Sequence, residues 1–233
     1  MLFHVPRLST DDSGGGLRVT LSVASVSLAI ACVIGLIGAS AKVYGGKAAR
    51  LSAAAYTTTV RALPDLLVML VVFYGGQILL NSISETYGWG YLDVDPYIAG
   101  VSTIGFVFGA YLTETFRGAI LIVPAGQIEA GFAYGLSRWQ VAFYILLPQM
   151  IRHAVPGLTN TWLVMLKATA LVSIIGLDDM VHRAGLASAA TREPFTFYAL
   201  IGLIYLAVTT FSVLLFGALE KLSSRGVRSG GAA

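Results

Sequence analysis

The sequence features that point most directly to a specific interaction lie in a polar stretch between residues 122 and 153. Glu129-Ala130-Gly131 is followed there by Gly135 and then by Ile145-Leu146-Leu147-Pro148. Apolar and polar residues are interleaved, which predicts two short amphipathic helices broken near Gly135, because glycine permits a positive φ. Pro148 is expected to help end the second helix. Such a helix pair can dock in a groove of another protein, and the alternative is a pair that lies at the lipid surface.

The chain carries no recognisable catalytic or metal-binding constellation. It lacks the Gly-x-x-x-x-Gly-Lys-Ser/Thr loop that cradles nucleotide phosphates, and it has no Ser, His and Asp grouping or close carboxylate pair. Cys32 is its single cysteine, which excludes an internal disulfide, and its three histidines lack metal-ligand spacing. We therefore expect neither an enzyme nor a resident metal or cofactor, and we expect no nucleic-acid partner.

The composition is that of a protein embedded in a bilayer. Of the 233 residues, 56% are hydrophobic and 12% are charged, and the mean hydropathy is +0.78, whereas soluble domains carry about 25% charged residues. A helix needs roughly 20 apolar residues to cross the hydrocarbon core. The apolar runs are continuous, without the alternation of β-barrel strands, and predict an all-α membrane protein with five transmembrane helices. The predicted spans are residues 19–41, 66–84, 96–116, 154–177 and 194–219.

Lysine and arginine are distributed unevenly between the segments on the two sides of these spans. The richer set comprises Lys42, Lys47, Arg50, Arg61, Arg117, Arg138, Arg152, Lys221, Arg225 and Arg228, and the poorer set comprises Arg7, Arg18, Arg183 and Arg192. Because positively charged loops remain in the cytoplasm, we expect the amino terminus outside, the carboxy terminus inside and the 122–153 stretch in the cytoplasm. Asp178, Asp179 and Glu193 then fall in outer loops, where we expect them to be solvated.

A single transmembrane domain is expected over residues 17–222, with a flexible outer tail at 1–16 and a cytoplasmic tail at 223–233. A cleaved signal peptide is the alternative for the first apolar run. Its spanning length and the basic residues after it argue against cleavage, because a signal core has roughly 7–15 residues. Small residues such as Gly105-x-x-x-Gly109 predict close helix packing, either within the chain or at a subunit interface.

Lys167 lies near the middle of the fourth predicted span. A lysine there costs roughly 2.5–3.5 kcal/mol on insertion scales and usually faces protein or water. It could attract a substrate carboxylate, pair with a carboxylate of a partner subunit, or form a structural hydrogen bond to backbone carbonyls. Asn160, Thr169 and Ser173 of the same span could add polar contacts to a substrate pathway, or could bond their own backbone.

Two charged pairs lie at helical spacing near span ends. Glu114 and Arg117 are three residues apart, and Arg61 and Asp65 are four apart, so each pair can join on one helix face. A structural pair is the expectation in both cases. Glu114 is also a candidate gate or pathway residue, because a carboxylate close to hydrocarbon rarely lacks a partner.

The Glu129 stretch resembles the cytoplasmic coupling loop of permease subunits in bacterial binding-protein-dependent ABC importers. It departs from the commonest form at Gly131, where a second alanine is usual. Lys167–Asp179 resembles the corresponding helix of polar amino acid permeases, and the Arg61–Asp65 and Thr113–Gly118 blocks agree. The similarity is greatest to permeases for histidine, lysine, arginine and ornithine, followed by the opine (octopine and nopaline) permeases.

The resemblance implies a type I ABC importer permease fold in the bacterial inner membrane. The implied coupling residues are Glu129, Ala130, Gly131, Gly135, Ile145 and Pro148. Nucleotide-binding ATPase subunits would dock on them and would bind the ATP and Mg. A second homologous permease, in a heterodimer, would complete the pathway within the membrane lipid, and a periplasmic binding protein would deliver an amino acid.

Two interpretations from other classes remain open. An ion-driven secondary carrier or a channel would use Lys167 as a relay and would need no docking loop, so changes at Glu129 or Gly135 would leave transport intact. A purely structural membrane subunit would need Lys167 only for assembly. Within the importer class, the runner-up substrate is an opine or another polar amino acid.

Overall fold

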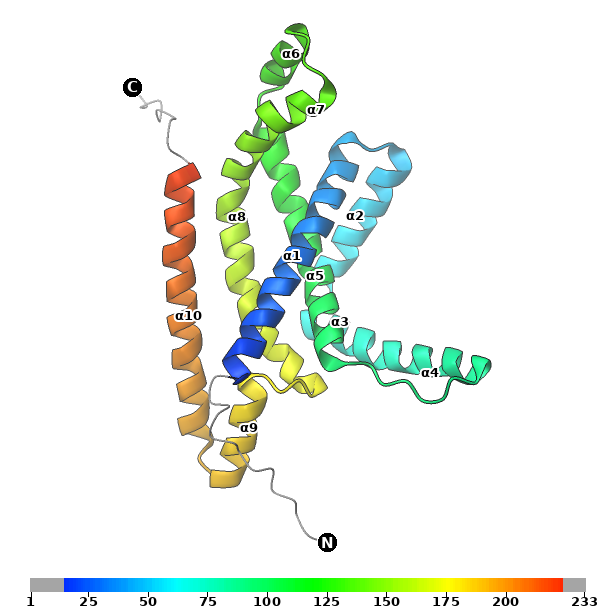
Figure 1. The fold of residues 1–233 in the computed structure, drawn as a ribbon, viewed down its shortest axis with the longest axis vertical. Helices are drawn as coiled ribbons and strands as arrows, with labels where there is room; N and C mark the ends of the chain where they lie inside the picture. Colours follow the sequence, from blue (N-terminus) through cyan, green and yellow to red (C-terminus); the bar gives the residue numbers. More distant parts are fainter. Residues whose placement is uncertain (1–14, 224–233) are drawn as a thin grey trace.

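The computed structural model describes residues 15–223, which form helices joined by short connections (Figure 1). Within this part of the chain, five helical segments are long and apolar enough to cross a membrane. Their bounds are Gly15–Tyr44, Asp65–Tyr87, Pro96–Ile122, Arg138–Ile175 and Pro194–Lys221. The predicted five-helix, all-α architecture is confirmed. The predicted tails, 1–16 and 223–233, lie almost wholly outside the described residues.

The spans and their connections divide into ten α-helices within the described residues. They are α1 (Gly15–Tyr44), α2 (Lys47–Ala62), α3 (Asp65–Leu70), α4 (Gly76–Tyr87), α5 (Pro96–Ile122), α6 (Ala125–Ala133), α7 (Arg138–Val141), α8 (Leu147–Ala168), α9 (Met180–Thr191) and α10 (Pro194–Ser223). The π-helical turns Val71–Gly75 and Ala142–Leu146 join α3 to α4 and α7 to α8, and the 3-10 helix Thr169–Ile175 continues α8. In Figure 1, α6 and α7 stand at one end of the bundle and α9 at the other.

The centre of the bundle is the close contact between α1 and α5. Each helix presents glycines on which side chains of the other helix rest, so the two backbones approach closely. The paired positions are Ile30 with Gly105, Ile34 with Gly109, Leu112 with Gly35, and Thr113 with Gly38. The predicted small-residue packing is confirmed, and at these positions it operates within one chain.

Helix α2 occupies the connection between the first two spans, where the sequence analysis predicted no element. It packs against α1 and α5 through Ala53, Thr57 and Val60. These small or polar side chains do not produce the hydropathy of a span, which explains why α2 was missed. Extended backbone at Leu63 and Pro64 then turns the chain into α3.

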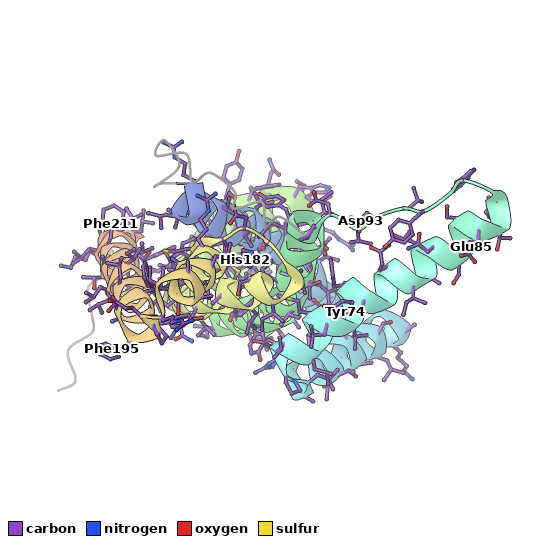
Figure 2. All side chains as sticks on the ribbon, turned by 90° about the horizontal axis from the view of Figure 1, so that it is seen from below. Tyr74, Glu85, Asp93, His182, Phe195 and Phe211 are labelled. Carbon is purple, nitrogen blue, oxygen red and sulfur yellow. The ribbon has the colours of Figure 1, made fainter. Side chains whose placement is uncertain are left out.

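Helix α4 and the irregular segment that follows it form an arm that projects away from the bundle (Figure 1). Figure 2 shows this arm, labelled at Tyr74 and Asp93, pointing away from α10. The side-chain amides of Gln77 and Asn81 accept hydrogen bonds from the main chain of residues 92–94, at 2.8 Å and 2.9 Å. These amides supply partners for backbone groups that have no regular structure of their own.

Asp179 holds the junction between the fourth and fifth spans. The expectation that it is solvated is wrong, because it is 1% exposed and caps α9 by accepting a hydrogen bond from the His182 N–H at 2.8 Å. Burial raises the pKa of the Asp179 carboxyl, and the hydrogen bond from His182 opposes that shift only in part. Asp178 lies in solvent, where it pairs with Arg183 at 2.7 Å.

We expect Gly38→Ala to destabilise the fold, because a Cβ at this position collides with the Thr113 side chain. Overpacking costs roughly 1–3 kcal/mol, which corresponds to about 2–4 °C of Tm per kcal/mol in detergent. Gly118→Ala is the matched control, since nothing lies within 4 Å of its Cβ position, and its Tm should hold or rise. Equal Tm values for the two variants would contradict the packing described above.

Asp179→Ala should lower the Tm more than Asp179→Asn does, because asparagine retains an oxygen that caps α9. Loss of a cap costs about 0.5–2 kcal/mol.

The pKa of Asp179 is raised above 3.8 in the folded protein, so the folded protein holds this proton to higher pH than the unfolded chain does. Wild type should therefore lose stability relative to Asp179→Asn as the pH rises above 3.8. Thermal melts of the three proteins across pH test both points, and equal stability of the two variants would refute the capping role.

Candidate functional site

The predicted coupling loop lies beyond the end of the bundle, where α5 gives way to the fourth span (Figure 1). It begins at Pro124, whose extended backbone precedes the first turn of α6. Glu129 and Ala130 of α6 are exposed, whereas Gly131 is buried. Within the described residues, the Glu129 carboxylate makes no hydrogen bond or ion pair. Two members of the predicted motif therefore lie on the surface, and the third faces the protein.

Helix α6 ends in a Schellman motif centred on Gly135, whose φ is +80° as predicted. The N–H of Leu136 donates to the Gly131 carbonyl at 3.1 Å, and the N–H of Gly135 donates to the Phe132 carbonyl at 2.9 Å. A residue with a Cβ is strained at this φ. The glycine thus fixes the turn that reverses the chain into α7.

Gly131 allows α6 to pack tightly against the fourth span. A Cβ at this position would lie 2.6 Å from Cδ1 of Ile145 and 3.1 Å from Cγ2 of Val141. A hydrogen bond of 2.6 Å between the side chains of Gln149 and Gln127 adds a polar contact between the same elements. The departure from the commonest motif at Gly131 therefore has a packing reason, which the sequence alone did not reveal.

Helix α7 is not the separate short helix that the sequence predicted. A capping box of Ser137 and Gln140 starts it, and it then continues through the π-helical turn into α8. The expectation that Pro148 ends a helix is wrong. Pro148 lies in the first turn of α8, directly after the π-helical turn. A proline there has no N–H to leave unpaired. Residues 138–175 consequently form one continuous helical rod.

Exposed aromatic side chains lie in the same segment as Glu129, and the sequence analysis missed them. Tyr134 is 89% exposed, Trp139 is 76% exposed and Tyr144 is 73% exposed. Tyr134 and Tyr144 border a shallow cavity of about 440 Å³ between α6 and the rod. Large aromatics are enriched in the centres of protein interfaces, and their clustering in a polar stretch was the available signal. We call Glu129, Ala130, Tyr134, Trp139 and Tyr144 the docking surface.

The candidate pathway residues do not gather into one site. The hydroxyls of Thr169 and Ser173 each donate to a carbonyl three residues earlier, at 2.7 Å, so both are satisfied by their own helix. Asn160 and Lys167 are exposed on the rod and make no hydrogen bond or ion pair with any described residue. Glu114 lies on α5, in a separate cluster.

Glu114 is the centre of an ionic cluster that joins α1, α2 and α5. Arg117 donates to it at 2.9 Å, which confirms the predicted pair. Lys42 of α1 donates to the other carboxylate oxygen and also to the Thr57 hydroxyl of α2, the latter at 2.6 Å. The sequence analysis missed Lys42 as a partner because it counted this residue with a loop. The cluster borders a polar cavity of about 570 Å³.

Arg61 and Asp65 do not form the expected ion pair in the part of the chain that the structure describes. Helix α2 ends at Ala62 and Pro64 follows, so the two residues lie on different helices. The Arg61 guanidinium instead lies over the Tyr111 ring, 5.2 Å from its centroid. Spacing along the sequence predicts a helical pair only where the helix is unbroken.

Glu114→Gln should destabilise the protein more than Arg117→Gln. The Lys42 side chain is 13% exposed and that of Arg117 is 40% exposed. Loss of the Glu114 charge therefore leaves a more deeply buried charge unpaired at Lys42 than at Arg117. Breaking a fully buried pair costs about 3–5 kcal/mol, while exposed pairs contribute about 0–1 kcal/mol. The double variant Lys42→Gln/Glu114→Gln should recover part of the lost Tm. The Tm losses of the single variants Lys42→Gln and Glu114→Gln are compared with that of the double variant. If the double variant loses the sum of the two, Lys42 and Glu114 are not coupled.

Comparison with known proteins places most of the chain in one family. Residues 31–225 match the family described as "Binding-protein-dependent transport system inner membrane component". The histidine/lysine/arginine/ornithine transport system permease protein HisQ of Escherichia coli is 50% identical over 215 residues, which cover 91% of this chain and 93% of that protein. The octopine transport system permease protein OccQ of Rhizobium meliloti is 38% identical over 213 residues, covering 91% and 90%.

Solved structures show the same fold. A chain from the crystal structure of an amino acid ABC transporter with histidines matches with a TM-score of 0.75 and 29% identity, covering 89% of this chain and 92% of that one. A chain of the MetNI methionine ABC transporter matches with a TM-score of 0.73 at 17% identity, covering 91% and 95%, and supports the fold alone. The chain therefore belongs to the family of binding-protein-dependent transport system inner membrane components, and it is a permease subunit of an ABC importer.

Proposed function

We propose that this permease serves an importer of basic amino acids, such as histidine, arginine, lysine and ornithine. The proposal is supported by the 50% identity to HisQ, against 38% to the octopine permease OccQ and 38% to the nopaline permease NocQ. An arginine ABC transporter permease, ArtQ of Haemophilus influenzae, is 39% identical. An opine or another polar amino acid is the second candidate substrate.

The docking surface is the proposed contact with a nucleotide-binding ATPase subunit, which would bind ATP and Mg. Glu129 offers a carboxylate without a partner among the described residues, and the exposed aromatic residues of the same segment offer contact area. The observation that carries the proposal is the continuity of α7 with α8. Because Gly131 and Ile145 hold α6 against this rod, a displacement of the docked surface moves the fourth span directly.

The proposed orientation puts the docking surface in the cytoplasm and the amino terminus outside the bacterial inner membrane. It is supported by the excess of lysine and arginine in the segments on the docking side, including Lys47, Arg138 and Lys221. The arm and α9 would then lie toward the periplasm, where a periplasmic binding protein delivers the amino acid.

A second, homologous permease is proposed to complete the pathway, as a heterodimer. Alternating access between the two subunits would give transport its direction.

Glu114 remains a candidate pathway residue because the polar cavity beside it, about 570 Å³, is in the size range of small-molecule sites. Asn160 is exposed on the rod and has no partner among the described residues, so it is available either to the pathway or to a contact with the second permease.

Glu129→Lys should abolish ATP-dependent uptake, because it reverses the one charge of the docking surface. The measurement is uptake of radiolabelled arginine, histidine, ornithine and octopine into proteoliposomes that hold the whole complex and its binding protein, with and without internal ATP. Glu129→Asp, which keeps a carboxylate at the same exposed position, is the matched control and should retain uptake. Uptake that is the same with and without ATP, and the same in wild type and Glu129→Lys, would favour the secondary carrier.

A further inference from the structure

The exposed face of α8 carries a line of polar side chains within a membrane-crossing helix. His153, Asn160 and Lys167 follow one another at intervals of seven residues, which places them close to one helix face. All three are exposed, and none makes a hydrogen bond or ion pair with a described residue. Val164, 43% exposed, lies on the same face. We call these four residues the α8 stripe.

Lys167 is too deep to reach lipid headgroups. It borders a groove of about 330 Å³ with Thr209, Thr210 and other residues of α10. These threonines lie at the middle of α10, which has 30 residues, so roughly 20 Å separate them from either helix end at 1.5 Å per residue. Because the hydrocarbon core is about 30 Å thick, a group at its middle lies about 15 Å from either headgroup region, which is farther than a lysine side chain extends. An ammonium group at this depth requires a carboxylate, other polar groups or water as its partner.

The described part of this chain supplies no carboxylate for Lys167. Glu114 is held by Lys42 and Arg117 on α5, and Asp179 caps α9. Asp65 borders a small cavity on a different side of the fourth span, next to Ala168. A carboxylate partner for Lys167 must therefore come from another molecule.

The groove beside Lys167 fits a protein helix better than an amino acid. Apart from Lys167, its walls are the aliphatic residues Leu163, Val213 and Leu214 with Thr209 and Thr210, and the Thr209 hydroxyl is already bonded to the Tyr205 carbonyl at 2.7 Å. An amino acid carries at least two charged groups, and each needs a polar partner when buried. A membrane helix with one carboxylate among apolar side chains needs only what this groove offers. An interval of seven residues is also the one at which a helix repeatedly meets a neighbour along its length.

We propose that the α8 stripe and the adjoining groove of α10 are the contact with a membrane helix of the second permease subunit, and that a carboxylate of that helix pairs with Lys167. This inference rests on the proposed function, which supplies the second permease. Asn160 and His153 extend the same contact toward the docking end of the rod. The pairing neutralises Lys167 within the membrane and sets the register between the two subunits.

Photo-cross-linking in the intact complex tests the location of the contact. A benzophenone amino acid placed at position 164 of the α8 stripe should give a covalent adduct with the second permease. The same amino acid at Val33, an exposed aliphatic residue near the middle of α1, is the control for non-specific labelling and should give at least tenfold less adduct. Equal adduct from the two positions, or none from 164 in an assembled complex, would overturn the proposal.

Substitution of Lys167 tests the pairing itself. Lys167→Met should retain at least tenfold less second permease through affinity purification of the tagged chain, whereas Lys167→Arg, which preserves the charge, should retain it. If the Lys167→Met complex assembles fully and only its KM for uptake rises, Lys167 contacts the substrate and the proposal is wrong. If wild type itself retains no second permease and shows no ATP-dependent uptake, the proposed function fails, and this outcome is distinguishable from the other two.

Discussion

The close approach of α1 and α5 is the constraint on which the rest of the structure depends. Glycines on both helices admit side chains of the other helix, and this contact brings Lys42 of α1 to Glu114 of α5. Lys42 also reaches α2 through Thr57, so one cluster ties three helices together. In a bilayer, where lipid tails give apolar side chains little reason to leave lipid for protein, such packing and polar contacts provide most of the driving force for helix association. Helices α2, α3, α8 and α9 pack against one or both members of this pair, and α10 packs on α8 and α9.

In the proposed function, the fourth span transmits motion from the docking surface to this scaffold. Its helix begins at Arg138, on the docking side, and continues to Ile175. The π-helical turn before Pro148 accommodates a proline without a break, as such turns often do at functional positions. Gly131 then allows α6 to pack on the rod. We propose that surface, turn and span move as one body, while the exposed stripe of the same rod faces outward from the subunit.

Local sequence signals predicted what depends on local physics. Hydropathy located all five spans, and the glycine of the Glu129 loop was correctly assigned a positive φ at Gly135. The errors arose where tertiary contacts decide the outcome. Helix α2 buries only alanine, threonine and valine, so its hydropathy is too low to indicate a span. Asp179 is buried where it caps α9. Pro64 separates the helix of Arg61 from the helix of Asp65. The aromatic docking surface was visible in the sequence, but only the fold shows that its members lie together.

The central claim, that the docking surface and the fourth span move as one body, can be measured by double electron–electron resonance in the reconstituted complex. Spin labels at Trp139 of α7 and Val164 of α8 lie on the same rod, and labels at Leu51 of α2 and Val164 connect two elements; all three positions are exposed. With Cys32 replaced, ATP binding should leave the distance between Trp139 and Val164 unchanged and should alter the distance between Leu51 and Val164. A change within the rod, with the span fixed relative to α2, would contradict the account.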